Sequence, residues 1–287
     1  MIIDGKKIAN QIAIDLKEKI LNIKGRKPTL MVILVGNNPS SLTYIKMKRK
    51  ACENIGFEFI LEHLDETITE EILLKTIEKA NLNKNIDALL VQMPLPEHIN
   101  DKKIFEKISP YKDVDGFNPE NIGKVLLGED DTFFSCTPLG IKVLLEKMNI
   151  DIQGKHVVIV GRSNIVGKPL AAMLMQKKKG CDATVTVANS RTQNLKEITK
   201  SADIIIAAIG KPKFITKDMV SKKAVIIDVG INHIIENGKK TIVGDTDFRN
   251  LYNYVKYITP VPKGVGPMTI AMLLNNVYKA YLINEKR

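Results

Sequence analysis

Residues 157–167 read VVIVGRSNIVG, an apolar run that ends in a glycine-containing turn and continues into a helix-like segment. A buried strand, a tight turn at Gly161 and a helix beginning near Gly167 are typical of a dinucleotide site, because the helix N-terminus presents backbone N–H groups to the pyrophosphate. Ser163 replaces the middle glycine of the usual pattern. Taken alone, this stretch therefore fits an ordinary strand-to-helix turn equally well.

The end of the next predicted strand indicates which dinucleotide fits. Residues 187–192 read VANSRT and contain no carboxylate that would bind the ribose hydroxyls of NAD. Ser190 and Arg191, with Arg162 in the turn, offer a hydroxyl and guanidinium groups that suit a 2′-phosphate. The sequence favours NADP over NAD; the competing interpretation is that Arg191 is a solvated surface residue.

Strand-like and helix-like segments alternate on both sides of this stretch. Strands are predicted at residues 30–35, 57–61, 88–91, 156–160, 184–188, 204–208 and 225–229, with helices between most of them, and those at 30–35 and 88–91 are expected to be buried. Residues 93–136 are irregular, apart from a short helix near Ile104, and long irregular stretches often carry function. The pattern predicts an α/β protein of two domains, rich in parallel sheet. We expect a substrate-binding catalytic domain at 1–138, completed by a C-terminal helix at 267–287, and a Rossmann-type NADP-binding domain at 139–266.

Composition narrows the function classes. The 287 residues are 44% hydrophobic and 26% charged, which is typical of a globular protein. The apolar runs are too short to cross a bilayer and the first ten residues lack a signal-peptide core, so we expect a cytoplasmic protein without membrane contact. The three cysteines are far apart and lack metal-binding spacing, so we expect reduced thiols and no metal.

The net charge of +11 suits a polyanionic partner, which includes nucleic acid, a phosphorylated cofactor or a poly-carboxylate substrate. Only 5% of the residues are aromatic and Trp is absent, which argues against a base-stacking surface. We therefore expect no nucleic-acid partner.

Candidate substrate residues lie in separate segments. Tyr44 and Lys48 stand four residues apart on a predicted helix and so share one face, although spacing alone favours an ordinary basic surface. Gln92 follows a predicted strand, where ligands bind in open α/β sheets, but a loop amide bonded to backbone fits as well. Residues 113–119, DVDGFNP, are either acidic ligands or turn caps. Residues 259–269, TPVPKGVGPMT, predict a rigid loop with close backbone approach.

Together these segments resemble the bifunctional methylenetetrahydrofolate dehydrogenase/cyclohydrolase family over essentially the whole chain. The resemblance rests on YIKMK (44–48), VQMPLP (91–96), DVDGF (113–117), CTP (136–138), GRS (161–163), DVGIN (228–232), PVP (260–262) and GVGPMT (264–269). It implies NADP-dependent oxidation of 5,10-methylenetetrahydrofolate to the methenyl form, followed by hydrolysis to 10-formyltetrahydrofolate. It also implies a homodimer acting on tetrahydrofolate derivatives, polyglutamylated forms among them.

The resemblance also assigns roles to residues. Lys48 is implied as the catalytic lysine and Tyr44 as a stacking partner of the folate, while Gln92 hydrogen-bonds Lys48 and Asp115 binds the pterin donors. Further substrate contacts are implied at Val91, Met93, Pro262, Gly264 and Gly266. NADP contacts are implied at Gly161, Arg162, Ser163, Ser190 and Ile231.

The two reactions make different demands on the protein. Hydride transfer to a nicotinamide depends mainly on positioning. Hydrolysis of the cationic methenyl bridge needs proton transfers near neutral pH, which a lysine beside that cation and an amide partner can supply. We therefore expect Lys48 to serve chiefly the hydrolytic step.

The sequence departs from the family pattern at three positions. Asn189 stands where a histidine is common, which leaves the strictness of NADP selection open. Thr246 replaces a common valine, and Lys263 replaces a glycine of the substrate loop. Lys263 either alters the shape of that loop or meets the glutamate tail of the folate.

Other functions remain open at this point. An NAD-linked relative with dehydrogenase activity alone is one, and a non-catalytic dinucleotide-binding or nucleic-acid-binding protein is another. The non-catalytic reading predicts that Lys48, Gln92 and Asp115 do not come together. A shikimate dehydrogenase relative lacks support, because its catalytic Lys and Asp pair is not recognisable here.

Overall fold

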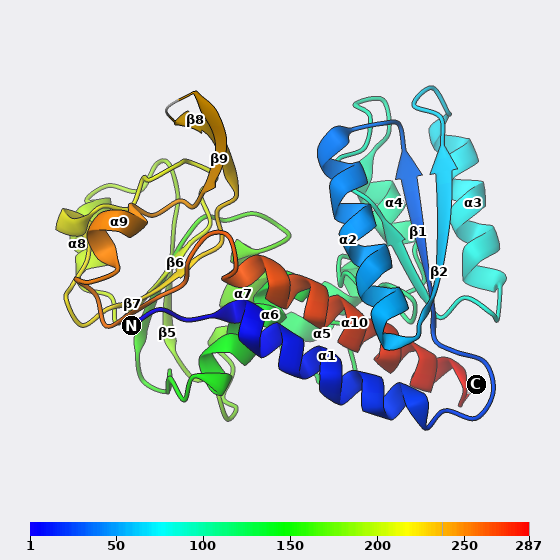
Figure 1. The fold of residues 1–287 in the computed structure, drawn as a ribbon, viewed down its shortest axis with the longest axis horizontal. Helices are drawn as coiled ribbons and strands as arrows, with labels where there is room; N and C mark the ends of the chain where they lie inside the picture. The colour runs from blue at the N-terminus through cyan, green and yellow to red at the C-terminus, as the bar shows by residue number, and fades with distance from the viewer. Residues whose placement is uncertain (237, 287) are drawn as a thin grey trace. The chain divides into compact units, whose positions relative to one another are not determined.

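The computed structural model describes residues 1–236 and 238–286 (Figure 1). The chain divides into two compact units, each built around a parallel sheet. Residues Gln11–Cys136 and Ile270–Arg287 form the three-stranded unit, and Met1–Asn10 and Thr137–Thr269 form the five-stranded unit. The predicted α/β class with two parallel-sheet regions is confirmed.

The three-stranded unit has the strand order β2-β1-β3, and both pairings are parallel. Figure 1 shows helices on both sides of this sheet, which explains why every residue of β1 and β3 is buried. Its elements are β1 (Thr29–Val35), α2 (Pro39–Ile55), β2 (Glu58–Leu64), α3 (Glu70–Leu82), β3 (Ala88–Val91), α4 (Asp101–Lys107) and α5 (Pro119–Leu127). Helix α10 (Val265–Asn284) contributes its later turns to this unit.

The five-stranded unit has the order β10-β7-β6-β4-β5, again with parallel pairings. Because β5 lies on one side of β4 and β6 on the other, the order reverses at β4, and ligands bind beyond the carboxyl ends of strands at such a point. The strands are β4 (His156–Val160), β5 (Thr184–Ala188), β6 (Ile204–Ala207), β7 (Val225–Asp228) and β10 (Tyr257–Ile258).

Shorter elements complete this unit. Strands β8 (Asn232–Glu236) and β9 (Lys239–Val243) form an antiparallel hairpin that was not predicted. The helices are α6 (Cys136–Lys147), α7 (Gly167–Leu174), α8 (Leu195–Lys200), α9 (Phe248–Leu251), a 3-10 turn at Lys217–Met219 and the start of α10.

The first ten residues lie in a different unit from the one in which they were expected. They belong to the five-stranded unit, because the backbone N–H of Ile3 donates to the Ile258 carbonyl at 2.8 Å and Ile2 pairs with Ile258. Helix α1 (Gly5–Leu21) therefore starts in this unit, although residues 1–138 were expected to form one domain. Within the described residues, no helix is both long and apolar enough to span a membrane.

Candidate functional site

Helix α2 sets the direction of Lys48. Asn38 caps the helix by accepting hydrogen bonds from the backbone N–H groups of Ser40 (3.0 Å) and Ser41 (3.3 Å), with Pro39 in the first turn. The helix buries one face against the sheet, including Ile45, Cys52 and Ile55. Lys48 lies on this same face, between Ile45 and Cys52, and is half-buried, while Tyr44 lies one turn earlier beside it and is exposed. The predicted sharing of one helix face therefore holds in the structure.

Lys48 and Gln92 meet directly. The Lys48 Nζ donates to Gln92 Oε1 at 2.9 Å, which is the predicted hydrogen bond. Gln92 follows β3 and is 9% exposed; its Nε2 donates to the Met93 carbonyl at 2.8 Å. Because the amide nitrogen is engaged there, the amide oxygen is the atom that faces Lys48.

Asp115 lies in the electrostatic field of Lys48. Burial raises the pKa of the Asp115 carboxyl above its usual value, while the Lys48 charge and a contact from Cys136 lower it. The Cys136 thiol is 3.9 Å from Asp115 Oδ1 and donates to the Val114 carbonyl at 3.3 Å. Burial raises the pKa of this thiol well above its usual value, so the sulfur is a neutral donor and not a thiolate nucleophile.

The backbone around Asp115 is held by two neighbouring segments. A Cβ on Gly116 would lie 2.7 Å from the Phe134 carbonyl carbon, so only glycine permits this approach. Asn276 of α10 is 4% exposed, and its Nδ2 donates to the carbonyls of Val114 (2.8 Å) and Phe134 (3.0 Å). Lys48, Gln92 and Asp115 thus come together in one unit, which contradicts the non-catalytic reading.

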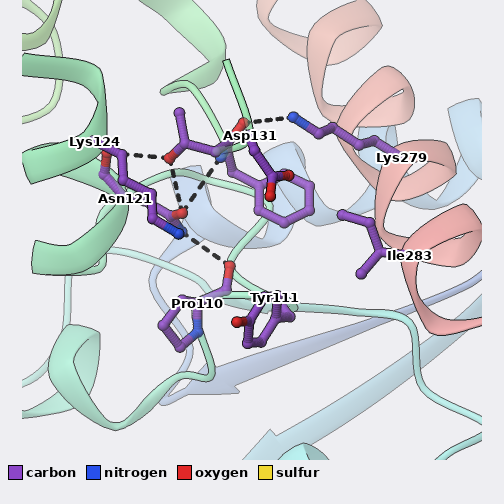
Figure 2. Close-up of a pocket in the computed structure, with 9 residues that line it drawn as sticks. Pro110, Tyr111, Asn121, Lys124, Asp131, Lys279 and Ile283 are labelled. Carbon is purple, nitrogen blue, oxygen red and sulfur yellow. Dashed lines mark hydrogen bonds between the residues drawn. The ribbon is translucent and has the colours of Figure 1, made fainter. Parts of the chain in front are cut away.

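Figure 2 shows a second feature of the three-stranded unit, a pocket lined by Pro110, Tyr111, Asn121, Lys279 and Ile283 among others. Asn121 donates to the Pro110 carbonyl at 3.0 Å and accepts from Thr132 Oγ1 at 2.9 Å, and Lys279 donates to the Thr132 carbonyl at 2.7 Å. These polar groups bond to one another across the pocket. The pocket therefore supports the chain that leads to Cys136.

The nucleotide turn has the geometry that its glycines predict. Gly161 has φ +135°, and a Cβ there would lie 2.1 Å from the Ala208 carbonyl oxygen. A Cβ on Gly167 would lie 2.2 Å from the Gly161 oxygen. Ser163 Oγ accepts from the backbone N–H of Val166 at 3.1 Å, so the residue that replaces the middle glycine closes the turn.

The turn after β5 lies beside the Gly161 turn, because the Gly161 N–H donates to the Ala188 carbonyl at 2.9 Å. Asn189 shapes this turn: its Oδ1 accepts from the Arg191 N–H at 3.0 Å, and its N–H donates to Thr192 Oγ1 at 2.8 Å. Arg162, Ser163, Ser190, Arg191 and Ile231 are all exposed. Hydroxyl and guanidinium groups are thus available beside the turn, as an NADP phosphate requires.

The Pro/Gly loop belongs to the five-stranded unit. Pro262 and Lys263 are exposed, Gly266 is half-buried, and a Cβ on buried Gly264 would lie 2.4 Å from the Pro260 oxygen. Lys263 has φ +87°, a backbone conformation that favours glycine.

Two more of the expected substrate contacts lie in the three-stranded unit. The Val91 side chain packs in its core at 2% exposure, and Met93 is half-buried.

Among the described residues, no group of three His, Cys, Asp or Glu side chains could hold a metal ion.

Comparisons with known proteins cover both units. Residues 3–115 match the model of the tetrahydrofolate dehydrogenase/cyclohydrolase catalytic domain, and residues 135–285 match the NAD(P)-binding domain of the same name. A bifunctional protein FolD from Protochlamydia amoebophila is 53% identical over 98% of this chain and 97% of that protein.

Solved structures of similar proteins share the fold of this chain over nearly its full length. The methylenetetrahydrofolate dehydrogenase/cyclohydrolase of Campylobacter jejuni has a TM-score of 0.93 and 47% identity, covering 99% of each chain. The Trypanosoma brucei dehydrogenase-cyclohydrolase, solved with NADP and an inhibitor, has a TM-score of 0.94 and 34% identity, covering 100% of this chain and 99% of that one. An NAD-dependent yeast dehydrogenase, at 21% identity, shares the fold.

Proposed function

Because this chain belongs to the tetrahydrofolate dehydrogenase/cyclohydrolase family, we propose that Lys48 moves the protons in the second of its two reactions. The chain is a bifunctional enzyme that oxidises 5,10-methylenetetrahydrofolate with NADP and hydrolyses the methenyl product to 10-formyltetrahydrofolate. The observation that carries the proposal is the 2.9 Å hydrogen bond from Lys48 to Gln92, beside the Asp115 carboxyl.

Hydrolysis is the step that needs a proton carrier. Water adds to the methenyl carbon and gives up a proton, and the carbon–nitrogen bond then breaks as the ring nitrogen gains a proton and the hydroxyl loses one. The proton from the hydroxyl passes to solvent and is the one proton that the reaction releases. Lys48 as a neutral amine takes the proton of the water and as an ammonium returns it to the nitrogen. Gln92 orients Lys48 through its amide oxygen, and Asp115 accepts hydrogen bonds from the pterin. The remaining substrate contacts are Tyr44, the Val91 backbone, Met93, Pro262, Gly264 and Gly266.

Oxidation depends on holding the substrate and cofactor in place. NADP, when bound, accepts the hydride from the one-carbon bridge. Gly161 and Ser163 shape the turn for the pyrophosphate, Arg162 and Ser190 meet the 2′-phosphate, and Ile231 contacts the cofactor from the loop after β7. What supports this assignment is the close approach at Gly161 together with the exposed polar groups of the two adjacent turns.

Lys263 recognises the glutamate tail of the folate in this proposal. Lys263→Asn removes the charge but keeps a residue that tolerates the left-handed backbone, whereas Lys263→Arg keeps the charge. We expect Lys263→Asn to raise KM for a polyglutamylated substrate about fivefold, as for one exposed ion pair, and to leave KM for the monoglutamate unchanged. Lys263→Arg serves as the control. An unchanged KM for the polyglutamylated substrate in both Lys263→Asn and Lys263→Gly would refute the contact.

A homodimer formed through the β5 edge is also part of the proposal. Strand β5 is an edge strand, and its Val187 side chain is 38% exposed; at the opposite edge, β10 is covered by the pairing of Ile2 with Ile258. We expect the protein to sediment as a dimer and Val187→Lys to sediment as a monomer. Ile242→Lys, at a residue that is 39% exposed on the β8–β9 hairpin, is the control and stays dimeric. A monomeric wild type would contradict the dimer.

We place the enzyme in the cytoplasm. The residues that support this placement are Cys52, Cys136 and Cys181, which are buried thiols without a disulfide, as expected in a reducing compartment.

A further inference from the structure

Two buried carboxylates in the five-stranded unit have no role in the reactions described above. Asp228 is the last residue of β7 and is 2% exposed; Asp245 follows β9 and is 0% exposed. Buried carboxylates are expensive unless several hydrogen bonds satisfy them. Their surroundings therefore indicate what these charges do.

The Asp228 carboxylate accepts four hydrogen bonds. Its Oδ1 accepts from the backbone N–H groups of Gly230 (3.0 Å) and Asp245 (2.9 Å). Its Oδ2 accepts from the Thr246 N–H at 2.9 Å and the Thr246 hydroxyl at 2.6 Å. All four donors are neutral, and together they fix the loop after β7 against residues 245–246.

Asp245 continues the same network into the loop after β6. Its Oδ2 accepts from the N–H groups of Ile209 (2.6 Å) and Gly210 (2.9 Å), and its Oδ1 accepts from Asn232 Nδ2 at 2.8 Å. The loop that Asp245 holds is the one that packs on the nucleotide turn, because a Cβ on Gly161 would lie 2.1 Å from the Ala208 oxygen.

Close backbone packing makes this arrangement specific. A Cβ on Gly230 would lie 2.2 Å from Asp245 Oδ1, and one on Gly244 would lie 2.0 Å from Asp228 Oδ2. Glycine at these two positions lets each carboxylate reach the N–H groups of the facing segment. Any side chain larger than a hydrogen there would separate the loops.

We propose that Asp228 and Asp245 are positioning residues, which hold the loops after β6 and β7 in the geometry that binds NADP. The inference rests on the proposed NADP site, since these loops border the Gly161 turn and carry Ile231. A carboxylate suits the task because it only accepts hydrogen bonds; an Asn at either position would turn an NH₂ group toward an N–H donor. Burial raises the pKa of Asp228 to about 6, although its hydrogen bonds lower it. Buried carboxyl groups whose pKa is raised in this way are typical of functional sites.

Thr246 allows a milder substitution in the same hydrogen-bond network. It stands where the family commonly has valine, and its hydroxyl is one of the four donors to Asp228. Thr246→Val keeps the shape of the side chain and removes that donor alone. It therefore weakens the network without leaving a polar group of its own buried and unpaired.

The experiment compares NADPH binding with hydrolysis in Asp228→Asn, Asp245→Asn and Thr246→Val. NADPH affinity is measured by calorimetry, and hydrolysis is measured on methenyltetrahydrofolate supplied without cofactor. We expect about tenfold weaker NADPH binding in each Asn variant and about threefold in Thr246→Val, with hydrolysis within about twofold of wild type. The control is Asp203→Asn, at an exposed aspartate of the same unit. Asp203 accepts from the His156 N–H at 2.9 Å at the opposite, amino end of the same sheet, so this variant should bind NADPH normally.

Two outcomes would overturn the proposal. One is wild-type NADPH affinity in Asp228→Asn and Asp245→Asn. The other is a parallel loss of NADPH binding, hydrolysis and thermal stability in all three variants, which would reduce the network to a purely structural role. A failure of the proposed NADP site itself is distinguishable, because Gly161→Ala would then bind NADPH as tightly as wild type.

Discussion

Gly161→Ala is expected to lower kcat/KM for NADP-dependent oxidation by about 100-fold, the order of loss that an ångström of misplacement produces. The new methyl group would lie 2.1 Å from the Ala208 carbonyl oxygen, a backbone atom that no rotamer change can move. The φ of +135° is, in addition, a conformation that alanine rarely adopts. The turn must therefore change shape at the proposed pyrophosphate site.

The control for Gly161→Ala separates backbone strain from the steric contact. Gly154 also has positive φ, at +67°, but a Cβ there would meet nothing within 4 Å. Gly154→Ala should leave the KM for NADP unchanged, and both variants should hydrolyse methenyltetrahydrofolate near the wild-type rate. A wild-type KM for NADP in Gly161→Ala would contradict the assigned nucleotide turn.

Lys48→Met is expected to reduce hydrolysis by about 100-fold or more, as is typical when a general acid–base group is removed. Methionine keeps the length of the side chain but cannot carry a proton, and Gln92 Oε1 loses the donor that lies 2.9 Å away. Oxidation relies on positioning and should fall much less. The methenyl intermediate should therefore accumulate while NADPH continues to form, and both are followed by absorbance.

Two further lysine variants define the role of the side chain. Lys46→Met removes an exposed lysine of the same helix and should retain both activities. Lys48→Arg keeps the positive charge but cannot be deprotonated, so it should also lose hydrolysis. Full hydrolysis in Lys48→Arg would mean that only the charge is required, which contradicts proton transfer by this residue.

Much of the fold was predictable because most of the parallel strands are continuous apolar runs, and the exposed edge strand β5 is rich in β-branched residues. Strands β3, β4 and β5 match the predicted residues 88–91, 156–160 and 184–188. Helix α5 was missed within the irregular stretch, although Asn118 caps it and Gly128 ends it in a left-handed conformation. Pro, Gly and Asn residues serve turns as well as helix ends, so their local pattern alone does not distinguish the two.

Local sequence pattern predicted only the individual elements of the site, and the Lys48–Gln92 contact was expected from the family resemblance alone. The sequence placed Lys48 on a helix and Gln92 at a strand end, but their contact depends on how α2 packs beside the sheet. Asn276 was missed because it reaches Val114 across 162 residues, and no local pattern reports such a contact. The carboxylate of Asp228 lies within a recognised motif, yet its four donors emerge only from the folded loops.

The most direct test of the account is hydrolysis of methenyltetrahydrofolate by Lys48→Met in the absence of NADP. This assay isolates the step that Lys48 is proposed to perform from cofactor binding and from hydride transfer. We predict hydrolysis near the uncatalysed background from a variant that still reduces NADP when given methylenetetrahydrofolate. Hydrolysis at the wild-type rate would contradict it.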